Sequence, residues 1–129
     1  MRSIIFIVSF LFSTTIWSYK SFAEWTYVAT GESTGVKSYI DLENIRKHDG
    51  YVYFWLLEDL LKPDQDGDLS YVNYFQVDCN IFRYKHLSGS YYKQAMGKGI
   101  AKNVSRESQW GYPLPNSLHE RYLEVVCGT

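Results

Sequence analysis

The sequence predicts an α+β fold, in which an antiparallel sheet carries a single helix at the C-terminus. Residues 71–84 alternate apolar and polar side chains, as a strand with one buried face requires. Residues 117–127 instead repeat apolar side chains at helical spacing. The alternating segment holds Cys79 and the helical one holds Cys127, so a bond between them would fix the helix across the sheet.

The first 23 residues have the pattern of a secretory signal peptide. Arg2 precedes an apolar run at residues 4–16, which is shorter than the roughly 20 residues of a spanning helix. Small residues at Ser21 and Ala23 predict cleavage between Ala23 and Glu24. A membrane anchor is the alternative. We therefore expect an exported protein, in the periplasm, secreted or at the cell surface.

Cleavage at this position would leave residues 24–129, which are enough for one domain with one core. No cysteine lies near the cut, so a lipid-anchored lipoprotein is not expected. In an exported protein, two cysteines predict one structural disulfide, Cys79–Cys127. Closing a loop of about 49 residues stabilises a domain by on the order of 4 kcal/mol. A reactive thiol, the alternative, needs a cytosolic setting or an activating base.

The first half of the expected sheet contains a hairpin and a central strand. Residues 25–30 and 36–40 form the hairpin, and Asp41 caps a short turn after it. Asp49 and Gly50 favour a tight reversal before a strand at residues 51–61. That strand is apolar on both faces, so either it is covered on both sides or its outer face meets a partner.

The second half is expected to contain two more strands and the helix. Residues 82–87 form a strand, Ser88-Gly89-Ser90 breaks it, and residues 91–104 form the last strand. Gly97 and Gly99 would accommodate a bulge or a close backbone approach in that strand. Ser117 and Glu120 form a capping box at the helix start. One arc of the helix is apolar: Leu118, Tyr122, Leu123, Val125, Val126 and Cys127.

Charge is unevenly distributed along the chain. Residues 24–80 hold 4 basic and 11 acidic side chains, whereas residues 81–129 hold 7 basic and 3 acidic ones. Residues 81–106 contain no acid, so this segment is a candidate surface for an acidic protein, an acidic polysaccharide such as a glycosaminoglycan, or a phosphorylated head group, and not for nucleic acid. The alternative is a sheet edge protected by lysines. The candidate partner-binding residues are Arg83, Lys85, Tyr91, Tyr92, Lys93, Lys98 and Lys102.

No motif indicates a metal site or an enzyme. The loop at residues 62–68 is acidic, but Phe75 stands where a calcium loop needs its glutamate. No G-x-S-x-G, H-E-x-x-H or C-x-x-C motif occurs. Glu58 and Asp59 are neighbours in a strand, where adjacent side chains point to opposite faces. We therefore predict a non-enzymatic protein without a metal.

The three histidines, His48, His86 and His119, lie far apart in the sequence. His48 falls in the tight reversal and is expected to be solvated. His119 falls within the apolar stripe of the helix. A ligand or base role is possible there, but a partly buried histidine with a hydrogen-bond partner is the expected state.

Several short motifs together resemble the surface-adhesin protein E family over residues 25–127. They are Trp25, Tyr39-Ile40-Asp41 with Ile45, Trp55, Asp78-Cys79, Gly97 with Gly99, Trp110 before prolines, and Val126-Cys127. The resemblance implies a six-stranded antiparallel sheet whose concave side carries the C-terminal helix, tethered by the disulfide. It also implies binding of host extracellular-matrix or plasma proteins, dimer formation and haem binding, but no individual binding residue.

Two functional hypotheses follow. The first is an exported, non-enzymatic binding module of the adhesin type. The second is a periplasmic accessory or structural domain whose apolar face serves a homodimer or an envelope partner. Haem is expected only through the resemblance, and no other cofactor is predicted.

Overall fold

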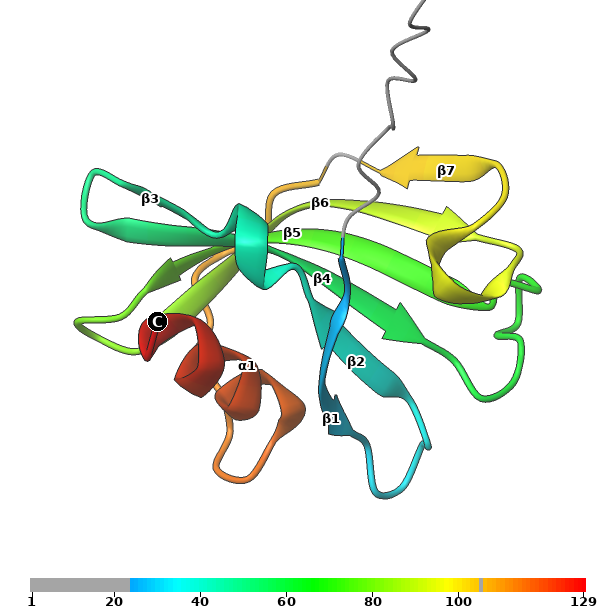
Figure 1. Ribbon diagram of the computed structural model, residues 1–129, viewed down its shortest axis with the longest axis horizontal. Helices are drawn as coiled ribbons and strands as arrows, with labels where there is room; N and C mark the ends of the chain where they lie inside the picture. The colour runs from blue at the N-terminus through cyan, green and yellow to red at the C-terminus, as the bar shows by residue number, and fades with distance from the viewer. Residues whose placement is uncertain (1–23, 105) are drawn as a thin grey trace, which may run out of the picture.

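A computed structural model describes residues 24–104 and 106–129. The predicted leader and Ala23 lie outside these residues. The described chain forms one antiparallel sheet, two short 3-10 turns and one helix, α1, which lies against one side of the sheet (Figure 1). The predicted α+β class is confirmed. No helix in this part of the chain is long and apolar enough to cross a membrane.

The sheet has the strand order β1-β2-β4-β5-β6-β7, and β3 also pairs with β4. β2 and β3 pair with opposite ends of β4 along one of its edges, and β5 pairs with the other edge. β4 is therefore the central strand of this half of the sheet. The strands are β1 Thr26–Thr30, β2 Lys37–Ile40, β3 Arg46–His48, β4 Tyr51–Asp59, β5 Ser70–Asp78, β6 Arg83–Tyr92 and β7 Ala101–Val104.

The described sheet therefore has seven strands where about six were expected. The additional strand, β3, pairs with the first three residues of β4 and projects with it beyond the end of β2 (Figure 1). The predicted tight reversal at Asp49 and Gly50 joins β3 to β4, with positive φ angles of 50° and 81°. Asp41 precedes the 3-10 turn Leu42–Asn44, but its side chain accepts from the Asn44 side chain and caps no backbone N–H.

The predicted break at residues 88–90 is wrong. β6 continues through Ser88 and Ser90 because β5 pairs with it on one side and β7 on the other. A Cβ on the intervening Gly89 would lie 2.6 Å from Asn73 Oδ1, which also bonds His86 Nε2, so a larger residue there would displace the Asn73 side chain.

The predicted strand at residues 91–104 is also wrong as a single element. Tyr91 and Tyr92 end β6, a 3-10 turn follows at Ala95–Gly97, and only Ala101–Val104 forms β7. Positive φ angles at Met96, Gly97 and Gly99 turn the chain away from the extended conformation. The glycines thus form a turn and not a bulge. The alternative of a close approach holds at Gly97, where an added Cβ would lie 3.2 Å from a methyl carbon of Val72.

Helix α1, Leu118–Cys127, begins as predicted. Ser117 Oγ accepts from the Glu120 backbone N at 3.2 Å. The Glu120 carboxylate accepts from the backbone N of Asn116, one residue before the cap. Three residues of the apolar stripe, Tyr122, Leu123 and Val126, are buried. They join a core from β2, β4 and β5 that contains Ile40, Val52, Phe54, Leu56, Phe75 and Val77.

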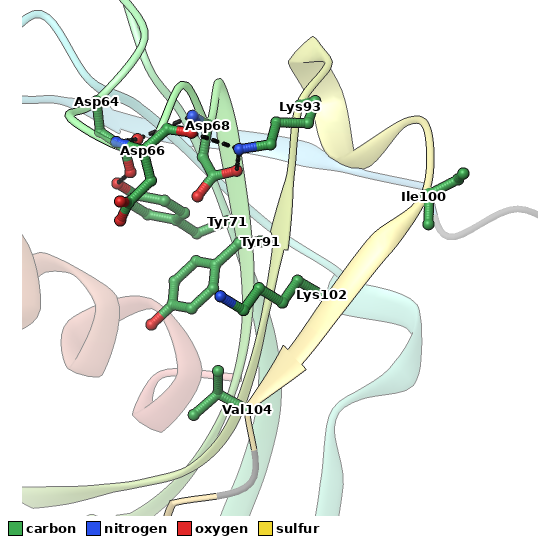
Figure 2. Close-up of a pocket in the computed structure, with 9 residues that line it drawn as sticks. All are labelled: Asp64, Asp66, Asp68, Tyr71, Tyr91, Lys93, Ile100, Lys102 and Val104. Carbon is green, nitrogen blue, oxygen red and sulfur yellow. Dashed lines mark hydrogen bonds and ion pairs between the residues drawn. The ribbon is translucent and has the colours of Figure 1, made fainter.

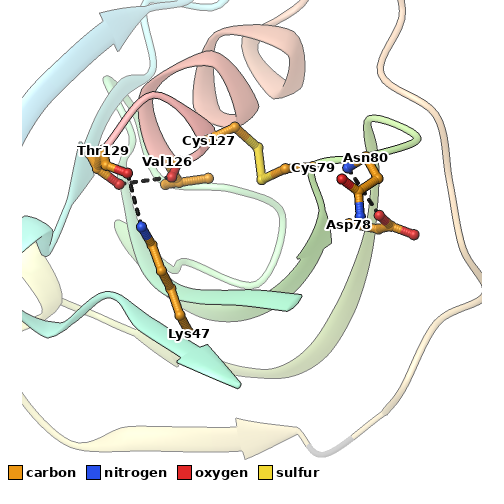
Figure 3. The surroundings of a disulfide bond; sticks show 7 residues. All are labelled: Lys47, Asp78, Cys79, Asn80, Val126, Cys127 and Thr129. Carbon is orange, nitrogen blue, oxygen red and sulfur yellow. Dashed lines mark hydrogen bonds between the residues drawn. A yellow bond between two sulfur atoms is a disulfide. The ribbon is translucent and has the colours of Figure 1, made fainter. Parts of the chain in front are cut away.

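The Cys79–Cys127 disulfide is present, with the two Cα atoms 5.7 Å apart (Figure 3). Cys79 directly follows β5, and Cys127 is the last residue of α1. Lys47 on β3 donates to the Thr129 carbonyl oxygen at 3.0 Å, so the chain end also contacts the sheet. The predicted covalent link between the sheet and the helix is confirmed.

Alternation along the strands gives the sheet two distinct faces. The helix face carries Phe54 and Phe75, which pack under α1. The opposite side, here called the outer face, carries Tyr53, Trp55 and Tyr74. The strands curve around the end of α1 in Figure 3, so the helix lies on the concave side.

Candidate partner-binding surfaces

Three stacked aromatic rings lie together on the outer face. Trp55 on β4 stands directly opposite Tyr74 on β5, with ring centroids 4.4 Å apart. Tyr53 stacks on the other side of Tyr74 at 6.0 Å. These three residues form the outer aromatic cluster. Trp55 is 37% exposed, and the two tyrosines are half-buried. The cluster therefore presents a fixed apolar surface to solvent.

A row of polar side chains crosses the sheet beside this cluster. Arg46 on β3 pairs with Tyr53, Tyr53 with Gln76, and Gln76 with Lys85 on β6. Since neighbouring strands lie about 4.8 Å apart, the row spans about 14 Å. Its two ends are cationic and its middle is neutral.

Most cations on the outer face already have acidic partners. Arg83 pairs with Asp78 at 3.2 Å, and Lys85 pairs with Glu107 at 3.1 Å. His48 Nε2 lies 3.0 Å from the Asp49 carboxylate. Among the residues that the structure describes, Arg46 is exposed and has no carboxylate within ion-pair distance.

Trp110 covers the cations at the β6 end of this face. Its ring lies 4.3 Å from the Arg83 guanidinium carbon and 4.7 Å from Lys85 Nζ. Tyr51 packs against the same ring at 5.7 Å. Cation–π contact and ion pairing together hold Arg83 and Lys85 against the fold, so both are only partly accessible.

A small cavity opens between β3 and the outer aromatic cluster. Its volume is about 190 Å³, and Arg46, His48, Tyr53 and Tyr74 line it. The cavity thus joins the free guanidinium to two tyrosine rings. These are the groups that can bind an anionic group with an apolar neighbour.

A larger groove of about 540 Å³ lies at the other end of the molecule, between the loop before β5 and strand β7 (Figure 2). Tyr71 and Tyr91 pack edge to face there, with ring centroids 5.1 Å apart. Lys93, Lys102 and the 91% exposed Ile100 also line it.

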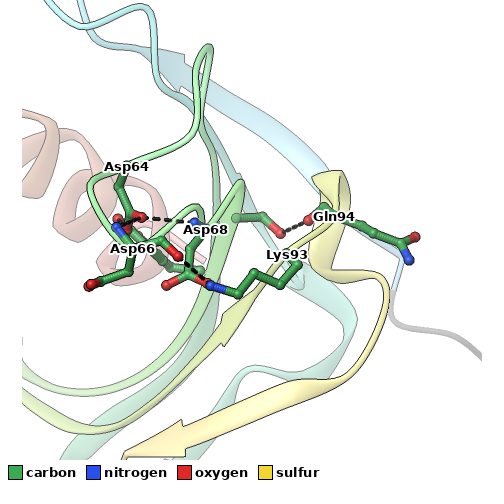
Figure 4. Close-up of polar contacts among 7 residues, drawn as sticks. Asp64, Asp66, Asp68, Lys93 and Gln94 are labelled. Atoms are coloured by element: carbon green, nitrogen blue, oxygen red, sulfur yellow. Dashed lines mark hydrogen bonds and ion pairs between the residues drawn. The ribbon is translucent and has the colours of Figure 1, made fainter.

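The acidic side of this groove is occupied by the fold's own hydrogen bonds (Figure 4). Asp64 Oδ1 accepts from the backbone N of Asp66 at 2.9 Å and of Asp68 at 2.8 Å. Tyr71 donates its hydroxyl to the other Asp64 oxygen, and this hydrogen bond lowers the pKa of Asp64. Lys93 Nζ pairs with Asp68 at 3.0 Å.

The three carboxylates thus lie close together, within 4.8 Å, although their spacing is not that of a calcium loop. The Asp64 oxygens already stabilise the loop, and the Asp68 carboxylate pairs with Lys93. The absence of a bound metal remains a prediction.

The candidate partner-binding residues between positions 81 and 106 lie at two separate locations in the structure. Arg83 and Lys85 begin β6 under Trp110, and Tyr91 lies near the other end of the strand, in the groove, about 20–27 Å away by strand rise. Lys93 and Lys102 lie with Tyr91, whereas Tyr92 and Lys98 lie outside the lining of the groove. These residues therefore do not form one continuous patch. Whether they bind a partner remains a prediction.

His119 lies in an aromatic box between α1 and the sheet. Its ring stacks on Tyr84 at 4.6 Å and meets Phe75 and Tyr122 edge to face. Burial lowers its pKa. The expected hydrogen-bond partner does not occur among the described residues, so ring packing holds this histidine. His86 bonds Asn73 Oδ1 and the Arg106 carbonyl.

The sequence profile of surface-adhesin protein E matches residues 25–128. The chain belongs to this family. The match includes every strand, the helix and both cysteines described above. The predicted family resemblance is confirmed.

Solved structures of Haemophilus influenzae protein E share the fold of this family member. One crystal form superposes with a TM-score of 0.59 at 16% identity, covering 82% of this chain and 97% of the other. A second superposes with a TM-score of 0.60 at 16% identity, covering 79% and 83%. Protein E from a non-typeable strain gives 0.58 at the same identity, covering 79% and 75%. No curated protein sequence matches.

The sequence indicated only part of the outer-face surface. The apolar run at residues 51–61 predicted that the outer side of this strand could meet a partner, and Tyr53 and Trp55 belong to it. Arg46, His48 and Tyr74 were not predicted as site residues. These residues come together only because β3 and β5 pair with β4, and the register of that pairing could not be predicted from the local pattern of any one segment.

Proposed function

We propose that this member of the surface-adhesin protein E family is an exported, non-enzymatic binding module of the adhesin type. Its contact surface is the outer aromatic cluster, Tyr53, Trp55 and Tyr74, with Arg46 at its edge. The observation that carries the proposal is the exposure of Trp55 within a rigid stack on the central strand. Aromatic side chains with a fixed conformation lose little entropy on binding and dominate many interfaces.

The outer face fits this role better than the groove does. In the groove, the acidic loop and Lys93 satisfy one another, so a partner that bound these groups would have to break existing bonds. On the outer face, the cluster is open and Arg46 is available. Family membership supports a surface-binding role for the chain as a whole.

Retention on an immobilised extracellular-matrix preparation tests the proposal. Trp55→Ala and Tyr74→Ala should each reduce retention of the processed protein at least tenfold, since each removes part of the stack. Ile100→Ala, which removes an exposed apolar side chain from the groove, is the matched control and should have no effect. Equal retention of all variants would contradict the assignment of the outer face as the contact surface.

Localisation separates this proposal from the periplasmic alternative. Protease added to intact cells should degrade a protein displayed on the surface. If the protein resists that treatment and is released whole from the periplasm, the adhesin role is excluded. The outer aromatic cluster would then serve a homodimer or an envelope partner.

A further inference from the structure

We infer that the cavity beside β3 binds an acidic glycan whose carboxylates are separated by neutral sugar residues. This inference rests on the proposed function and names the ligand class of the same face. The cavity of about 190 Å³ is lined by Arg46, His48, Tyr53 and Tyr74. It is small enough to take one sugar of the glycan chain. The next sugars of that chain would lie along the open outer aromatic cluster.

Arg46 supplies the charge recognition. It is exposed, and no described carboxylate pairs with it, so its planar guanidinium is free to bind a carboxylate through two parallel hydrogen bonds. The adjacent His48 lines the same cavity, but its Nε2 already lies 3.0 Å from the Asp49 carboxylate. Arg46 alone could therefore form charge-assisted hydrogen bonds with a carboxylate here without displacing a carboxylate partner.

Tyr53 and Tyr74 supply the neutral part of the site. Each offers an apolar ring edge together with a hydroxyl, which matches a sugar ring with its C–H groups and hydroxyls. Gln76 continues the row from Tyr53 towards Lys85 with an amide that both donates and accepts. The surface next to Arg46 thus favours neutral polar groups over further charge.

The spacing of charge on the face selects against densely anionic partners. Arg83 and Lys85 are paired with Asp78 and Glu107 and lie under Trp110. A polymer with adjacent negative charges would meet one free cation, Arg46, and then the carboxylates of these pairs. A polyacidic peptide or a heavily sulfated glycan is therefore less complementary than a glycan with isolated carboxylates.

Titration of the exported, processed protein with hyaluronan octasaccharide tests the inference, because this probe carries one carboxylate per two sugars. Calorimetry should detect binding that weakens at least tenfold in Arg46→Gln, with a smaller loss in Arg46→Lys, which keeps the charge but not the planar fork. Tyr53→Ala should also weaken it. Lys102→Gln, which removes a groove cation, is the matched control and should bind as the wild type does.

Three outcomes overturn the inference: no binding of the octasaccharide, unchanged affinity in Arg46→Gln, or equal affinity for polyglutamate. The third outcome would identify an acidic peptide as the ligand. Retention on the matrix preparation distinguishes these failures from failure of the proposed function. If Trp55→Ala still abolishes retention while the octasaccharide does not bind, the face is a binding surface for another partner.

Discussion

The Ser38 hydroxyl on β2 and the Tyr122 hydroxyl on α1 form a buried hydrogen bond between residues 84 positions apart. Ser38 is 0% exposed and Tyr122 1%. This contact and the Cys79–Cys127 disulfide fix the middle and the C-terminal end of the helix to the sheet. The helix is thereby held on the concave side, which leaves the outer aromatic cluster uncovered.

The buried hydroxyl pair should behave as a coupled unit. Tyr122→Phe leaves Ser38 without its partner and should lower the free energy of unfolding by about 1–3 kcal/mol. Adding Ser38→Ala should recover part of that loss, because no unpaired hydroxyl then remains. Chemical denaturation of the wild type, both single variants and the double variant measures the coupling. Strictly additive losses would show that the two hydroxyls do not interact.

The disulfide should contribute strongly to stability. Cys79 and Cys127 are 48 residues apart in sequence, and closing a loop of this size is worth on the order of 4 kcal/mol in the chain-entropy model. We expect Cys79→Ala/Cys127→Ala to unfold at much lower denaturant concentration. The oxidised protein should also migrate faster than the reduced one on a denaturing gel. Two titratable thiols in the denatured, unreduced protein would refute the bond.

Acid should destabilise the fold through His119. Burial lowers its pKa in the folded state below the unfolded value of about 6.5. In that range the unfolded chain binds more protons, so stability is greatest above pH 6.5 and falls as the pH drops below it. His119→Phe keeps the ring in the aromatic box and should flatten this part of the stability profile. A slope equal to that of the wild type would rule out His119 as its source.

Glu58 should change stability with pH in the opposite direction to His119, lowering it as the pH rises. It lies across from Ser38 on the helix face, and burial raises its pKa above 4.5. The unfolded chain ionises first as the pH rises, so this group opposes folding above about pH 4.5. Glu58→Gln should therefore be more stable than the wild type at pH 7 and similar to it at pH 4. Thermal unfolding at both pH values tests this, and destabilisation at pH 7 would contradict it.

Local patterns in the sequence were sufficient for most of the fold. The alternation in β5 and the apolar stripe of α1 each depend on one continuous segment, and both were predicted correctly. β3 was missed because Arg46–His48 is short and entirely polar, so only its pairing with β4 makes it a strand. The interruption predicted at Gly89 failed for a related reason, since strands on both sides stabilise β6 there.

The candidate surface was less predictable than the fold. Arg83 and Lys85 stand out in the sequence because residues 81–106 contain no acid, yet Asp78 and Glu107, which flank that segment, pair with them in the fold. Arg46, which the sequence does not distinguish, is the cation left free beside Tyr53. Charge pairing across strands decides which cations remain available, and that pairing depends on a register that no single segment determines.

Footprinting of exposed aromatic residues by hydroxyl radicals, with and without the matrix preparation, tests the central assignment most directly. The outer aromatic cluster is expected to be protected on binding, with Trp55 showing the largest change because it is the most exposed of the three rings. Tyr91 and Tyr112 should react equally in both samples. Protection of Tyr91 in the groove, with Trp55 and Tyr74 unchanged, would place the contact surface elsewhere and contradict the account.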